Sequence, residues 1–189
     1  MFDAAPPATV LGGDTRRING LHLAEAPPCG LVTYRGDLAD PRLAAALHSL
    51  LGLGVPAQGQ LVRNGEAMVG WMSPDELLIL TPRSDAGSVV AGIAQAMRGA
   101  HHLVLDLSDA RTVLVMNGQG LRQVLAKVTP ADLRLSSAPT GTLRRSRIGQ
   151  VAAAMAFTAE GEVLVFCFRS VGRYVFDLLA QSAKDGIAV

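Results

Sequence analysis

The sequence AMVGWMSPDELLILTPRSDAGSVVAGIAQAM, residues 67–97, combines two strand patterns with one helix pattern. Two short apolar runs flank the tetrapeptide SPDE at 73–76. Proline presets the backbone at the second position of a turn and aspartate suits the third, so this segment predicts a β-hairpin. Ser84 or Asp85 can then cap a helix. The apolar positions of that helix recur at helical spacing: Val89, Val90, Ile93, Ala94 and Met97.

The same order of patterns returns near the C-terminus. Residues 145–157 and 162–168 are strand-like and flank Ala159-Glu160-Gly161, which predicts a second hairpin. Ser170 is placed to cap a helix after it. We expect the inward face of this helix to consist of Val171, Tyr174, Val175, Leu178 and Leu179.

Two further helices and four strands complete the expected elements. Asp40 and Pro41 are typical of a helix start and Gly52 of its end, with Leu43, Ala46, Leu47, Leu50 and Leu51 on one face. Asn117 is placed to cap a helix carrying Leu121, Val124, Leu125 and Val128. The remaining strand patterns are residues 21–24, 31–34, 103–107 and 111–116.

This order predicts an α+β fold made of two ferredoxin-like βαββαβ-type units. We expect mostly antiparallel sheets, each with helices on one face. The expected organisation is an extended arm at 1–19, a first ferredoxin-like half at 20–108 and a second at 109–189. The prediction rests on element order, because the two halves share little sequence.

The composition favours a chain with a covered surface. Charged residues make up 17% of the 189 residues, against about 25% in an average soluble domain. The basic residues are fifteen Arg and two Lys, and Arg is favoured over Lys in interface cores. A GC-rich genome explains the same bias equally well. The net charge of +1 gives no support for nucleic-acid binding.

The sequence also indicates a compartment. The first ten residues lack the basic and apolar regions of a signal peptide, and the apolar runs are strand-length, so no membrane segment is expected. Cys29 lies in a Pro-rich loop and Cys167 in an apolar run, which does not suggest a disulfide framework. We expect a cytoplasmic protein with reduced thiols.

No catalytic or metal-binding set is evident. The four histidines have no second ligand at a useful spacing, so no metal site is expected. The segment NGQG at 117–120 lacks the third glycine and the lysine of phosphate-binding loops, and a helix cap explains it better. No serine lies in a nucleophile elbow, and Cys167 between two phenylalanines is typical of an inert core thiol.

The segment DLSDAR at 106–111 is the first of two polar features that stand out. Asp106, Ser108 and Asp109 can hold a polar ligand or orient Arg111. The alternative, which we favour, is a polar bend between paired strands whose carboxylates accept hydrogen bonds from backbone N–H groups.

The second feature is a group of arginines, Arg134, Arg144, Arg145 and Arg147, with no acid between 134 and 147. Because side chains alternate along a strand, Arg145 and Arg147 should share one face. They can contact an acidic partner surface or an anionic cofactor tail. A solvated strand end is the equally weighted alternative. Asp106, Arg145 and Arg147 are therefore weak candidates for cofactor binding, and the four arginines are candidates for a partner interface.

Several segments in order resemble the gamma subunit of heterotetrameric sarcosine oxidase. They are WMSPDELLIL at 71–80, DLSDAR at 106–111, LAK at 125–127 with DL at 132–133, and the strand at 145–154. The resemblance extends from about residue 20 to 182. It implies a fold like the folate-binding fold of the glycine-cleavage T-protein, an aminomethyltransferase.

The resemblance also implies an assembly. Alpha, beta, gamma and delta subunits together oxidise sarcosine to glycine and pass the one-carbon unit to tetrahydrofolate. FAD, FMN and NAD are implied for the alpha and beta subunits, and none of the cofactors for this chain. One-carbon metabolism and sarcosine catabolism are therefore the expected context.

One departure bears on catalysis. T-proteins carry an acidic pair just after a Gly-Gly-Val-like stretch, and the best match here is Gly149-Gln150-Val151 followed by residues 152–154, which are alanines. An alanine can neither take a proton nor stabilise a positive charge. The expected role is thus a non-catalytic subunit, with a stand-alone folate-binding protein or aminomethyltransferase-like enzyme as the alternative.

Overall fold

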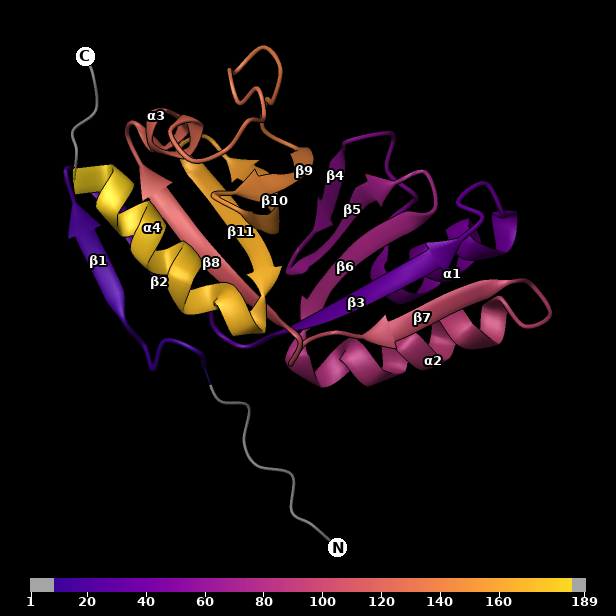
Figure 1. The fold of residues 1–189 in the computed structure, drawn as a ribbon. Helices are drawn as coiled ribbons and strands as arrows, with labels where there is room; N and C mark the ends of the chain where they lie inside the picture. The colour runs from indigo at the N-terminus through magenta and orange to yellow at the C-terminus, as the bar shows by residue number, and fades with distance from the viewer. Residues whose placement is uncertain (1–8, 185–189) are drawn as a thin grey trace, which may run out of the picture.

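The computed structural model describes residues 9–184, and within them the chain forms eleven strands in two sheets with four α-helices (Figure 1). The five-stranded sheet has the order β4-β5-β6-β3-β7. Its strands are β3 (Cys29–Gly36), β4 (Leu61–Asn64), β5 (Ala67–Ser73), β6 (Glu76–Pro82) and β7 (His102–Asp106). The helices α1 (Pro41–Leu51) and α2 (Ala86–Ala96) belong to the same half.

The six-stranded sheet has the order β1-β2-β8-β11-β10-β9. Its strands are β1 (Thr15–Ile18), β2 (Leu21–Glu25), β8 (Arg111–Gly118), β9 (Thr142–Ile148), β10 (Val151–Ala159) and β11 (Glu162–Phe168). The helices α3 (Leu121–Ala126) and α4 (Gly172–Lys184) cover it, and α4 lies across β2 and β8 in Figure 1. All strand pairs within the described residues are antiparallel.

The two sheets repeat one plan. In each, the first strand of the unit lies beside the last strand of its hairpin, so β4-β5-β6-β3 corresponds to β9-β10-β11-β8. A 3-10 turn, η1 (Arg83–Asp85) or η2 (Arg169–Val171), then leads into α2 or α4. The place that β7 takes in the first sheet is taken in the second by β2. The ferredoxin-like pairing order is present in both sheets, and β2 completes it in the second sheet.

The N-terminal segment differs from the extended arm that the sequence predicted. Residues 15–18 form β1, which pairs with β2, where an extended arm at 1–19 was expected. Both strands belong to the sheet of the second half, so the sheets do not follow a boundary at residue 108. Residues 1–8 of the expected arm lie outside the described residues. The division into two domains stays a prediction.

Alternating side chains fill three apolar clusters, and these define four layers. In β6, Leu77 and Ile79 pack toward α1 and α2, whereas Leu78 and Leu80 pack toward the other sheet. The middle cluster contains buried side chains from strands of both sheets and none from a helix. The sheets thus pack face to face with helices outside, which is why so many strands are continuous apolar runs.

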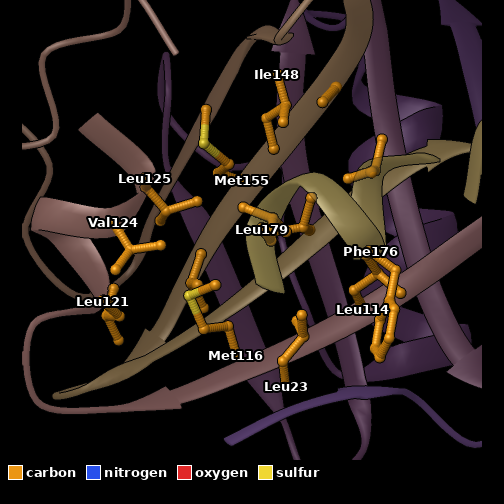
Figure 2. Packing of buried hydrophobic residues seen from close by; sticks show 14 of the residues in the cluster. Leu23, Leu114, Met116, Leu121, Val124, Leu125, Ile148, Met155, Phe176 and Leu179 are labelled. Atoms are coloured by element: carbon orange, nitrogen blue, oxygen red, sulfur yellow. The ribbon is translucent and has the colours of Figure 1, made fainter. Parts of the chain in front are cut away.

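The third cluster joins the six-stranded sheet to α3 and α4. Figure 2 shows side chains from both helices meeting the strands from one side. The residues labelled there are Leu23, Leu114, Met116, Leu121, Val124, Leu125, Ile148, Met155, Phe176 and Leu179. On α4 the buried face is centred on Val175, Phe176 and Leu179, and Tyr174, expected inside, is 46% exposed.

Local signals explain both ends of α1. Asp40 accepts a hydrogen bond from the backbone N–H of Arg42, and Gly52 ends α1 in the left-handed conformation at φ 65°. Leu50, expected on the buried face, is 38% exposed because it lies at the edge facing Gly92 of α2. The predicted cap of α3 is wrong: β8 continues through Asn117, and Gly120 precedes the helix.

Two strand predictions also need correction. The pattern at 145–157 is two strands, since Gly149 (φ 56°) and Gln150 form a tight turn between β9 and β10. The strands β7 and β8 are not paired with each other, because the chain crosses from one sheet to the other between Asp106 and Arg111. The first hairpin, around residues 73–76, is where it was predicted.

Each sheet meets its second helix at a very close contact. A Cβ atom on Gly30 of β3 would lie 3.0 Å from the Cβ of Ala86, the first residue of α2. In the second half the small residue is on the helix, because a Cβ on Gly172 would lie 2.7 Å from Oγ1 of Thr112 in β8. The strand and the helix approach too closely for a side chain on both.

A candidate binding cleft between the two sheets

A cleft of about 150 Å³ opens between the sheets where β6 and β8 begin. Its polar side chains are Thr33, Glu76, Arg111 and Arg145. Its apolar walls come from Met72, Leu78, Ala154, Phe166 and Phe168. Both halves of the molecule contribute to each set, so the face-to-face packing of the sheets creates the cleft.

Glu76 is held by partners from both sheets. Its Oε2 accepts from Nη2 of Arg35 at 3.1 Å and from Nη1 of Arg145 at 3.4 Å. Its Oε1 lies 3.4 Å from the hydroxyl of Thr33, which donates to it. The Glu76 side chain is only 13% exposed, so these contacts compensate a carboxylate that has lost most of its water.

Arg111 is the polar residue of the cleft whose side chain has no hydrogen-bond acceptor among the described residues. Its guanidinium lies 4.1 Å from the centre of the Phe168 ring. Arg111 and Phe168 are directly opposite each other in the pairing of β8 with β11. Among residues 9–184 no oxygen accepts a hydrogen bond from the guanidinium. Burial lowers the pKa of Arg111 from its ordinary value, an effect that the charge of Glu76 opposes.

The segment at 106–109 forms a bend at the edge of this cleft, and Leu107 is its member that lines the cleft. Asp106 accepts hydrogen bonds from the backbone N–H of Ser108, at 2.8 Å, and from its hydroxyl. The Ser108 hydroxyl in turn accepts from the backbone N–H of Leu31 at 2.8 Å. Asp109 pairs with Arg83. The carboxylates thus serve backbone groups and a neighbouring arginine, and the contact that orients Arg111 is Phe168.

The structure separates the four arginines of the sequence candidate. Arg134 forms a bidentate pair with Asp132 inside its own loop, at 2.9 and 2.7 Å, and this pair lowers the pKa of Asp132. Arg144 donates to the carbonyls of Gly59 and Ser137 and so ties β9 to two loops.

Arg145 and Arg147 alternate with a half-buried serine along β9 and are both exposed, which agrees with one shared face. Arg145 reaches the cleft. Arg147 has no acceptor among the described residues.

The alanines after Gly149-Gln150 line the cleft on the β10 side. No carboxylate projects from this strand between Val151 and Ala159. The acid of the cleft is Glu76, which comes from the other sheet. From the sequence Glu76 is a turn residue, and only the packing of the two sheets brings it opposite Ala154.

Large apolar side chains are exposed on two of the strands near the cleft, β7 and β11. Leu103 and Leu105 of β7 are each 45% exposed, and Phe168 is 48% exposed. Leu105 lies directly opposite Thr33 in the register of β3 and β7, so it continues the cleft wall. This exposure could not be predicted, because the apolar run at 103–107 indicates a strand but not which of its faces stays uncovered.

A second hollow lies beside the cleft. A wide surface groove of about 830 Å³ is lined by Trp71, Met72, Arg144 and Arg145 among others. Within residues 9–184 there is no group of three or more metal-ligating side chains. Since every strand pair there is antiparallel, that part of the chain has no parallel βαβ unit of the kind that holds a dinucleotide. No helix of the described chain has the length and apolar character needed to cross a bilayer.

Comparison with known proteins identifies the family. The family described as "Sarcosine oxidase, gamma subunit family" matches residues 35–185. The sarcosine oxidase subunit gamma of an Arthrobacter species is 38% identical over 135 residues, covering 62% of this chain and 65% of the relative. That of Corynebacterium sp. strain P-1 is 37% identical with the same coverage. The alignment therefore spans just under two thirds of the length of these relatives.

Solved structures agree on the fold. A chain of heterotetrameric sarcosine oxidase from Corynebacterium sp. U-96, in complex with pyrrole 2-carboxylate, superposes with a TM-score of 0.83 at 20% identity. The match covers 96% of this chain and 97% of that one. Glycine cleavage system aminomethyltransferase T from Bartonella henselae gives 0.62 at 14% identity, over 89% of this chain and 50% of that one.

These matches confirm the predicted α+β, T-protein-like fold and the resemblance drawn from the motifs. The chain belongs to the sarcosine oxidase gamma subunit family.

Proposed function

We propose that this chain is a non-catalytic gamma subunit of a heterotetrameric sarcosine oxidase. The observation that carries the proposal is the family match over residues 35–185, together with a fold shared along 97% of a chain from such an oxidase. The alpha, beta and delta subunits are its proposed partners. The proposed reaction is oxidation of sarcosine to glycine with transfer of the one-carbon unit to tetrahydrofolate.

In this proposal the other subunits carry the chemistry. FAD, FMN and NAD are held outside this chain, in line with the antiparallel pairing of its described strands. The wall of alanines in β10 supports a role without acid–base catalysis, because the position that matches the acidic pair of T-proteins offers no titratable group. We place the complex in the cytoplasm.

The surface supports a role as a subunit. Leu103, Leu105 and Phe168 form an exposed apolar rim, with Arg111 half-buried beside them. Aromatic residues and arginine are enriched where interfaces are most tightly packed, and charged residues are depleted there. Such a rim is costly on a free monomer and is stabilised when a partner covers it.

Purification of the tagged chain from its native cell extract tests the proposal. The expected result is a yellow eluate with flavin absorbance bands, which contains larger chains that mass spectrometry identifies as the other oxidase subunits. Sarcosine-dependent oxygen consumption by the eluate is the activity readout. If the chain is recovered colourless and at its own mass from cells that oxidise sarcosine, the proposal is wrong.

A second candidate function is stand-alone binding of tetrahydrofolate, as in an aminomethyltransferase-like enzyme. The groove with Trp71, Arg144 and Arg145 favours it, because an aromatic ring and two guanidinium groups suit a flat ring and anionic tail. The fold likeness to aminomethyltransferase T points the same way. Titration of the purified chain with a reduced folate decides, since no binding at millimolar concentration would remove this candidate.

A further inference from the structure

The cleft between the sheets carries one uncompensated positive charge. Two arginines, Arg111 and Arg145, and one acid, Glu76, line it, which leaves a formal charge of +1 (2 − 1). Glu76 already accepts from Arg35, Arg145 and Thr33. Arg111 is therefore the guanidinium of the cleft that makes no hydrogen bond to the described residues.

Arg111 is positioned for a ligand and not simply exposed. One face of its guanidinium is fixed by the Phe168 ring at 4.1 Å, which leaves its N–H edge as the group available for hydrogen bonds. A half-buried guanidinium with unused donors is unfavourable, because water replaces its lost hydrogen bonds only in part. An anion that accepts two parallel N–H bonds removes that cost, and carboxylates have this geometry.

The walls of the cleft determine the polarity and the size of the uncharged part of the ligand. Met72, Leu78, Ala154 and Phe166 present apolar surface beside the charged group. A cavity of about 150 Å³ is large enough for a benzene-sized group, as a cavity of this volume in another protein shows. It is smaller than the roughly 300 Å³ at which pockets for cofactor-sized ligands begin.

We propose that the cleft binds a small organic monocarboxylate, with its carboxylate on Arg111 and its apolar part between Met72, Leu78 and Phe166. The charge of +1 selects a monoanion. The apolar walls select an organic carboxylate over an inorganic anion, since they cannot replace the hydration shell of phosphate or chloride. All residues of the site belong to this chain.

Benzoate is the probe, and benzamide is its neutral match in size. Saturation-transfer NMR of the full purified chain should show benzoate binding with a dissociation constant of about 1 mM, a usual efficiency for so few heavy atoms. Benzamide should bind at least about tenfold more weakly, because hydrogen bonds to a charged group contribute more than neutral ones.

Three variants locate the binding. Arg111→Gln should weaken benzoate binding about tenfold or more, and Arg111→Lys, which keeps the charge but not the fork, should weaken it less. Arg147→Gln is the matched control, since Arg147 is an exposed arginine of β9 outside the cleft. It should bind benzoate as the parent chain does.

Four outcomes overturn the proposal: no saturation transfer from the chain to benzoate, equal binding of benzamide, unchanged binding in a folded Arg111→Gln chain, or equal loss in the Arg147→Gln control. Displacement of benzoate by phosphate at equal concentration would also overturn it, because the site would then be a general anion site. Near-UV circular dichroism of each variant separates loss of the site from loss of the fold.

Discussion

Replacement of Thr112 by valine should stabilise the protein. Thr112 lies in β8, is 1% exposed, and its hydroxyl has no hydrogen-bond partner among the described residues. It points at Gly172, the residue of α4 whose missing side chain makes room for it. In Thr112→Val a methyl group takes the place of the hydroxyl, so the shape is kept and the unpaired polar group is removed.

The size of the effect follows from the cost of the buried hydroxyl. A buried polar group without a partner costs about 1–3 kcal/mol, and an apolar group of the same shape avoids this cost. For a chain of this length each kcal/mol shifts the melting temperature by roughly 2–4 °C. Thr112→Val should therefore raise the melting temperature by at least about 2 °C.

The matched control is Thr142→Val. Thr142 in β9 is also 1% exposed, but its hydroxyl donates to the carbonyl of Pro139 at 2.7 Å. Its removal should lower the free energy of unfolding by about 1 kcal/mol. Urea unfolding and thermal melting of both variants give the comparison. If Thr112→Val destabilises the protein as much as Thr142→Val does, the assignment of an unpaired hydroxyl is wrong.

Three further predictions concern packing, pH and the surface. Gly172→Ala should lower the free energy of unfolding by about 1–3 kcal/mol, because its Cβ meets Thr112 at 2.7 Å. In a double-mutant cycle, adding Thr112→Gly should recover part of this loss, because the strand then carries the glycine and the helix the alanine, as Gly30 and Ala86 do in the other half. If the two changes in free energy of unfolding are simply additive, the close contact is contradicted. Burial raises the pKa of Cys167 from 9.0 to about 11, so the folded state favours the neutral thiol. Stability should thus be complete below pH 9 and fall as the pH rises toward 11, by about 1.4 kcal/mol per unit of the shift. Cys167→Ala should remove this part of the pH dependence, and an identical alkaline slope in both proteins would refute it. Leu103→Ser with Leu105→Ser should change the stability of the isolated chain by less than about 1 kcal/mol, since both side chains are exposed. The same pair should reduce recovery of flavin-bearing companions, whereas Leu50→Ser on the helix side should not, and equal recovery from both would place the interface elsewhere.

Local sequence signals predicted elements well where each signal stands alone. The tetrapeptide at 73–76 and the helix start at Asp40 and Pro41 are strong signals with one interpretation each, and both are where they were expected. The turn at Gly149 and Gln150 was missed because a single glycine marks it, without the Asn-Gly or Asp-Gly pair that is typical of two-residue hairpin turns. Two strands joined by such a weak turn signal are easily taken for one longer strand.

The pairing of strands that are distant in the chain could not be predicted from the sequence. A strand pattern such as Leu21–Glu25 indicates one buried face and does not name its neighbour, so nothing placed β2 beside β8. The cleft follows the same rule. Glu76, Arg111 and Phe168 come from different strands, and only the packing of two sheets makes them one site. The candidate arginines were found through composition, which locates charge but not contacts.

The placement of β2 has a consequence for synthesis on the ribosome. The strands of the five-stranded sheet are contiguous in the chain, from Cys29 to Asp106, so that sheet can close while the second half is still being made. The six-stranded sheet cannot, because β2 has no neighbour to pair with until β8 has been made. The turn after β1 depends on a still later segment, since the Asn19 side chain donates to the carbonyl of Ala183 in α4. At bacterial elongation rates Leu21 and Leu23 stay uncovered for on the order of ten seconds. The first hairpin of the chain is thus among the last parts to be buried, and a nascent chain stalled before β8 should be a preferred substrate for chaperones.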